Sequence, residues 1–189
     1  MRESTRWTTK YQYVNMLLTN LKATAIAFVF FAGAFYGFMN KPIIKEILSV
    51  VFITMYFGIV YSRAHKFAAL DKKDYTQTKP NLLKGILFGV AISITYAVFL
   101  AIYALMWKYV GVDGTINSVP AWIYSLVFWF YTIPYSGIMG LAHGQMMWYS
   151  QILMLIIPVL ATTLGYLAGL KGFNLMDKMA GAIYEKNEN

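Results

Sequence analysis

Long uncharged runs alternate with short basic segments along the chain, a pattern typical of helices that cross a membrane. The first run covers residues 23–40 and follows a basic lead in which Lys22 stands at the boundary. The turn sequence Asn40-Lys41-Pro42 separates it from a second predicted helix at residues 43–62. A cleaved signal peptide is the rival interpretation of the first run, but its basic lead is long for that role and an apolar chain follows.

The most polar stretch covers residues 63–84, where six Lys or Arg residues face two Asp residues. We interpret it as a cytoplasmic loop, because cytoplasmic loops are enriched in positive charge. A third helix is predicted at residues 85–107, whose 23 uncharged residues would extend about 35 Å, enough to span a bilayer with some tilt. A polar turn around Asp113 and Gly114 follows.

Residues 114–170 contain no Lys, Arg, Asp or Glu, and residues 151–170 read as a clear helix. The earlier part, residues 121–141, is apolar but rich in aromatic residues, and Pro134 and several glycines interrupt it. It is therefore either a fifth crossing or a re-entrant or interfacial segment. Four crossings place thirteen positive residues inside and three outside, whereas five place ten inside and six outside. The positive-inside rule favours four crossings, with both termini cytoplasmic.

The tail, residues 171–189, places Phe173, Met176, Ala180 and Ile183 at helical spacing between charged residues. This pattern predicts a short amphipathic helix lying on the membrane, with a frayed terminus as the alternative.

Composition agrees with a single transmembrane domain. Of the 189 residues, 59% are hydrophobic and only 13% are charged, against about 45–50% and about 25% in average soluble domains. The chain has no cysteine, which excludes disulfides and thiolate chemistry. Its net charge of +8 suggests contact with anionic lipid headgroups rather than with nucleic acid. We expect the basic residues of the polar stretch, notably Arg63, Lys66, Lys72 and Lys73, to lie beside those headgroups.

Two segments, KPNLLKGILFGVAISITYAVF and IIPVLATTLGYLAGLKGFNLMDKM, resemble parts of small uncharacterised polytopic membrane proteins of Gram-positive bacteria. In those proteins a Lys-Gly pair starts a middle helix, and a Gly-Tyr-x-x-Gly helix precedes a basic tail. The resemblance implies a multi-pass protein of a bacterial plasma membrane. It implies no activity and no functional residues.

Small residues recur every four positions in the predicted helices. The longest row is Gly85, Gly89, Ser93, Ala97 and Ala101, and shorter pairs are Gly33 with Gly37 and Gly165 with Gly169. Such rows let helix backbones approach closely in lipid, where no hydrophobic force drives helices together. They predict either packing within the chain or docking to another subunit or to a second copy.

Candidate chemistry is sparse. His143 with Gln145 and Gln151 could line a polar site, but no acidic residue lies near them in sequence. Metal sites need three or four ligands, and no phosphate-binding, hydrolase or metalloprotease motif is present, so no cofactor, metal or catalytic residue is predicted. We therefore predict an all-α, non-enzymatic integral membrane protein that acts through helix contacts, as an accessory or assembly subunit or a small homo-oligomer. The alternative is a small-molecule transporter or substrate-binding subunit with its site in residues 121–150.

Overall fold

The computed structural model of the chain describes residues 8–37, 42–73, 78–110, 132–135 and 148–173. Every regular element in these ranges is helical, which confirms the predicted all-α class. The elements are α1 (Thr9–Gly37), α2 (Pro42–Asp71), α3 (Leu82–Val110), the 3₁₀ turn η2 (Ile133–Tyr135) and α5 (Trp148–Lys171).

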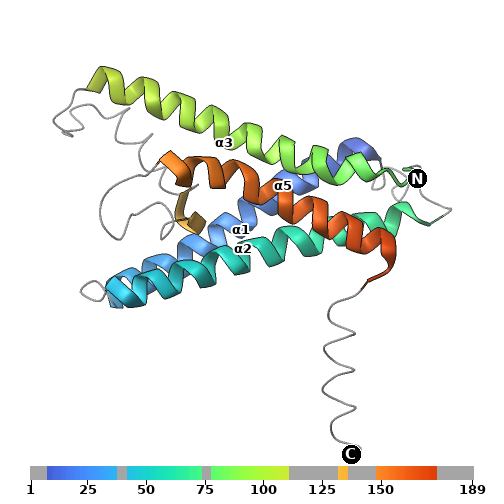
Figure 1. The fold of residues 1–189 in the computed structure, drawn as a ribbon, viewed down its shortest axis with the longest axis horizontal. Coiled ribbons are helices and arrows are strands. Elements are labelled where there is room, and N and C mark those ends of the chain that lie inside the picture. The colour runs from blue at the N-terminus through green and yellow to red at the C-terminus, as the bar shows by residue number, and fades with distance from the viewer. Residues whose placement is uncertain (1–7, 38–41, 74–77, 111–131, 136–147, 174–189) are drawn as a thin grey trace, which may run out of the picture.

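The four long helices lie side by side as a bundle (Figure 1). Helix α5 packs against both α2 and α3, and α1 packs mainly against α2. Helices α1 and α3 begin, and α2 and α5 end, at the end of the bundle where the N label is drawn. We call this the Asp71 end. Successive long helices therefore run in opposite directions, and η2 lies against α1 and α2 inside the bundle.

Helices α1 and α2 are longer than the uncharged runs that predicted them. Helix α1 begins at Thr9, not near residue 23, because the Thr8 side chain accepts a hydrogen bond from the Tyr11 amide (3.3 Å) and caps the first turn. Gln12, Met16 and Asn20 then follow at helical spacing, and all three are buried. Charge marks where a helix leaves the hydrocarbon, whereas capping and packing decide where the helix itself begins.

The predicted loop at residues 63–84 is wrong over its first nine residues, which continue α2 to Asp71. The reason is again burial at helical spacing: Ala64, Phe67, Ala68 and Asp71 are all buried. Near the other end of that range, Asn81 caps α3, since its Oδ1 accepts a hydrogen bond from the Leu83 amide (3.0 Å).

Helix α5 ends in a Schellman motif at Gly172, which has a positive φ of 69°. The Phe173 amide donates to the Ala168 carbonyl (2.9 Å), and the Gly172 amide donates to Gly169 (3.2 Å). The Lys72 ammonium also donates to the Leu170 carbonyl (2.9 Å), so a basic residue that we expected at headgroups also caps α5. The amphipathic tail predicted from residue 171 lies outside the described residues beyond Phe173.

Apolar side chains cover much of the outer surface as well as the core, and several polar side chains are buried. The outer face of α3 exposes Ile86, Val90, Ile94 and Val98, while Gln12, Asn20, Asp71 and Lys84 are buried among the helices. Three segments of the described chain are long and apolar enough to cross a membrane, namely Thr9–Phe30, Leu82–Ile102 and Gln151–Lys171.

Small residues bring three helix backbones into close contact. A Cβ on Gly85 would lie 2.8 Å from Tyr166 Cβ, and one on Gly89 would collide with the backbone of Val159, both on α5. Ser93 lies one turn further on and donates to the Leu155 carbonyl (2.6 Å).

The pair Gly165 and Gly169 approaches the other neighbour of α5. A Cβ on Gly165 would collide with the Tyr61 carbonyl of α2, and one on Gly169 with the His65 carbonyl. The backbone of α5 thus has close contacts with α2 and α3. Ala97 is exposed on α3, and the surroundings of Gly33 and Gly37 are outside the described part.

We expect Gly89→Ala to destabilise the protein by about 1–3 kcal/mol, because the added methyl meets backbone that cannot turn aside. Gly58→Ala on α2 is the matched control, since a Cβ there meets nothing within 4 Å. It should be neutral or slightly stabilising through helix propensity. Thermal unfolding in detergent, followed by circular dichroism, measures both. Equal unfolding temperatures for the two variants would contradict the packing.

Candidate functional site

The interior holds two polar clusters at different depths. The first, which we call the end cluster, lies at the Asp71 end and consists of Gln12, Asp71, Thr78, Lys84 and Tyr166. Asp71 Oδ2 accepts hydrogen bonds from Lys84 Nζ and from Tyr166 Oη, each at 2.6 Å. Asp71 Oδ1 accepts from Gln12 Nε2 (2.7 Å) and from Thr78 Oγ1 (2.5 Å). One carboxylate thus joins α1, α2, α3 and α5.

These donors control the ionisation of Asp71. Burial by itself raises the pKa of a carboxyl group, but the hydrogen bonds from Lys84, Thr78, Tyr166 and Gln12 outweigh it. The pKa of Asp71 is therefore held below its ordinary value, and the group is an anion paired with the Lys84 ammonium.

The end cluster is suited to structure rather than to chemistry. A carboxylate has about four acceptor positions, and Asp71 has four donors, so none is left for a substrate or a metal. The side-chain carbonyl of Gln12, which points away from this pairing, is buried without a hydrogen-bond partner among the described residues.

The second group, which we call the tyrosine cluster, consists of Asn20, Tyr56, Tyr96 and Tyr135. Tyr56 Oη donates to Asn20 Oδ1 at 2.6 Å, and Tyr96 Oη donates to the same oxygen at 3.3 Å. The Tyr135 ring meets the rings of Tyr56 and Tyr96 edge-on, at centroid distances of 5.5 and 5.8 Å. All four side chains are buried.

Tyr135 differs from the other members of the tyrosine cluster. It comes from η2, within the chain between α3 and α5. Its hydroxyl lies within hydrogen-bonding range of the Tyr56 and Tyr96 hydroxyls, but it makes a well-aligned hydrogen bond with no described group. A phenol can donate one hydrogen bond and accept others, so this atom has capacity for a further polar contact. Gly85 is the first residue of the uncharged run in α3, and Tyr96 lies about 17 Å further along the helix. This distance is close to half of a hydrocarbon core of about 30 Å.

The residues proposed from sequence are distributed differently. His143 and Gln145 lie outside the described residues, and Gln151 is half-buried in the first turns of α5. Within the described ranges, no group of three or more His, Cys, Asp or Glu side chains could hold a metal ion. Sequence reasoning missed both polar clusters, although Tyr135 falls within residues 121–150, the segment in which the alternative interpretation placed a site.

Comparisons with known proteins add no assignment. No protein-family model matches the chain, and neither a curated protein nor a solved structure matches it. The resemblance to Gram-positive membrane proteins therefore stays a prediction.

We expect Asp71→Asn to destabilise the protein by about 3–5 kcal/mol, because the Lys84 ammonium is left buried without a counter-charge. Adding Lys84→Met should recover much of this loss by removing the stranded charge. Lys79→Met, at an exposed position, controls for the loss of a lysine. Unfolding temperatures in detergent compare the variants. A double variant no more stable than Asp71→Asn alone would exclude the ion pair as the cause.

The same pairing predicts acid sensitivity. Because the native pKa of Asp71 is lowered, its ionised form contributes stability above about pH 4, near the pKa of an unfolded Asp. This contribution is lost as the pH falls through the lowered native value. The unfolding temperature of the wild type should therefore fall more steeply than that of Asp71→Asn below about pH 4. Parallel curves for the two proteins would contradict this prediction.

Proposed function

We propose that the chain is a non-enzymatic integral membrane protein with four crossings that binds a small uncharged polar solute in its interior. The observation that supports it best is the tyrosine cluster, where the buried Tyr135 hydroxyl makes no well-aligned hydrogen bond to a described group. This corresponds to the binding or transport alternative of the sequence interpretation.

The membrane location is supported by the apolar outer surface of the bundle. A face of Ile86, Val90 and Ile94 in water would oppose folding, whereas in lipid it has no such cost. Helix α2 would be the fourth crossing, because its residues 47–62 carry no charge and it packs along α1 and α5.

The ends at which the helices meet support four crossings. Helix α3 ends and α5 begins at the end of the bundle opposite the Asp71 end (Figure 1). The chain between them would then cross an even number of times, and the buried 3₁₀ turn at Ile133–Tyr135 interrupts it, which favours a re-entrant segment over two full helical crossings. We infer that this segment is re-entrant, with η2 at its inner part. Non-helical backbone is tolerated at such depth where it is buried in protein.

The type of solute follows from the neutrality of the tyrosine cluster. Its hydroxyls and amide carry no charge, and the described ion pair lies at the Asp71 end. An ion would meet no counter-charge from these four residues, whereas a neutral molecule with hydrogen-bonding groups could use Tyr135 Oη and the remaining acceptor positions of Tyr56.

Topology gives the first test. Tags placed between Asp74 and Lys79 and after Glu185 should both be accessible from the cytoplasm, because the tail and the α2–α3 connection lie at one end in a four-crossing protein. Cysteine-accessibility labelling in whole cells measures this, with a tag near Gly114 as the external control. An external tail with a cytoplasmic connection would establish an odd number of crossings.

Transport gives the second test. Proteoliposomes should pass small neutral solutes such as glycerol or urea faster than protein-free liposomes, and Tyr135→Phe should reduce that rate several-fold by removing the Tyr135 hydroxyl. Tyr61→Phe on α2, outside the tyrosine cluster, is the matched control. Stopped-flow light scattering measures the flux. A flux equal to that of empty liposomes would contradict a transport function.

An accessory subunit is the second candidate, favoured by Ala97 and Ala101. Rows of step four drift around a helix by about 40° per step, so the row that meets α5 at Gly85, Gly89 and Ser93 emerges on the surface at these two alanines. A partner helix could approach there. A stoichiometric companion after purification in mild detergent, lost in Ala97→Leu, would favour this candidate over solute binding.

A further inference from the structure

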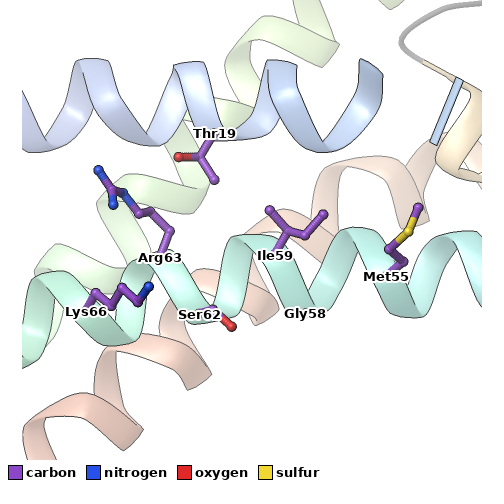
Figure 2. Close-up of a pocket in the computed structure, with 7 residues that line it drawn as sticks. All are labelled: Thr19, Met55, Gly58, Ile59, Ser62, Arg63 and Lys66. Carbon is purple, nitrogen blue, oxygen red and sulfur yellow. The ribbon is translucent and has the colours of Figure 1, made fainter. Parts of the chain in front are cut away.

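A groove runs between α1 and α2 on the outside of the bundle (Figure 2). Its volume is about 460 Å³. Thr19 lines it from α1, and the rest of the lining comes from α2: Met55, Gly58, Ile59, Ser62, Arg63 and Lys66.

The two ends of the groove differ in chemistry. Met55, Gly58 and Ile59 form an apolar end, while Arg63 and Lys66 form a cationic end. Neither cation makes an ion pair with a described carboxylate. The groove therefore presents net positive charge at one end and hydrocarbon along the rest.

Arg63 is held in position before any ligand binds. Its Nε donates to Asn15 Oδ1 at 2.7 Å, and its guanidinium carbon lies 4.8 Å from the centroid of the Phe67 ring. These contacts leave the terminal guanidinium nitrogens for an anion, and a planar guanidinium binds phosphate oxygens in pairs. Lys66 adds an exposed ammonium one turn further along the helix.

The position of the groove fits one leaflet of a bilayer. Arg63 directly follows the uncharged residues 47–62, so it would lie at headgroup level in the proposed topology. From Met55 to Lys66 is about 17 Å along a helix, close to half of a hydrocarbon core of about 30 Å. Gly58 widens the apolar end, since a Cβ there would meet nothing within 4 Å.

We propose that this groove binds one anionic phospholipid, with its phosphate on Arg63 and Lys66 and an acyl chain along Met55, Gly58 and Ile59. The inference rests on the proposed membrane location but not on solute binding by the tyrosine cluster. It goes beyond general attraction to a charged surface, because it assigns a stoichiometry, two cations and an apolar path.

Native mass spectrometry of the full chain in mild detergent tests the site. We expect one dioleoyl phosphatidylglycerol to bind more tightly than dioleoyl phosphatidylcholine, which has no net charge. Arg63→Gln with Lys66→Gln should weaken phosphatidylglycerol binding about 30-fold, at about 1 kcal/mol per cation. Lys66→Gln alone should weaken it about fivefold by the same reasoning, and it leaves the Asn15 and Phe67 contacts of Arg63 intact.

Two variants and one competition experiment distinguish a specific lipid site from general attraction to positive charge and from a site for phosphate alone. Lys79→Gln with Lys171→Gln removes two exposed cations outside the groove and should change the affinity by less than the groove pair does. Gly58→Leu fills the apolar end, so it should weaken lipid binding with both cations present. Inorganic phosphate should not displace the lipid at matched concentration, since it lacks the acyl chain.

Equal losses of phosphatidylglycerol affinity in the Arg63→Gln, Lys66→Gln variant and the Lys79→Gln, Lys171→Gln variant would overturn the proposal. Displacement of the lipid by inorganic phosphate, or an unchanged lipid affinity in Gly58→Leu, would also overturn it. A protein partner or second copy bound in place of lipid and lost in Gly58→Leu would overturn it too. Topology labelling of the same variants keeps the two hypotheses apart. Lost lipid binding with the expected topology leaves the membrane assignment standing, whereas a wrong topology overturns that assignment itself.

Discussion

The buried carboxylate of Asp71 is the constraint on which the arrangement of the bundle depends. An isolated ion inside a protein costs several kcal/mol, so a charge at this place requires compensation from every side. It receives donors from α1, from the residues just before and at the start of α3, and from α5. Sliding α3 by one turn, about 5.4 Å, would separate the Asp71 anion from the Lys84 cation. Sliding α1 or α5 by the same distance would remove the hydrogen bond from Gln12 or from Tyr166.

Backbone contact then fixes the lateral arrangement. Gly85 and Gly89 of α3 approach one side of α5, and Gly165 and Gly169 of α5 approach α2. In lipid this close approach supplies van der Waals contact that the hydrophobic effect cannot provide. The glycines thus determine the distances between helices, and the end cluster determines their register. Neither set alone would specify a single bundle, because glycine rows permit sliding and a single ion pair permits splaying.

Uncharged runs predicted that helices exist but not where they end. Residues 9–22 and 63–71 are helical because capping and burial continue past the last apolar run, and charge counting does not detect either. The end cluster was beyond sequence reasoning for another reason. Asp71 and Tyr166 are 95 positions apart, and no local pattern reports that pairing. The aromatic residues between α3 and α5 suggested a segment at the membrane–water interface. Tyr135, however, lies in the interior of the bundle, where its ring packs on two other tyrosines.

Polarity changes with depth in a consistent order. Asp71 and Lys84 carry opposite charges at the end of the bundle, where the cost of an ion is lowest, and they neutralise each other. Arg63 and Lys66 have no such partner and face outward at the predicted headgroup level, where lipid phosphate can supply the missing charge. Further along the helices, the tyrosine cluster offers hydroxyls and an amide without charge. This order follows from the free-energy cost of removing polar groups from water. For ions the cost rises with depth, whereas for neutral groups hydrogen bonds within the protein can offset it. The Tyr135 hydroxyl, which makes no well-aligned hydrogen bond within the described part of the chain, is therefore the least expected feature of this interior.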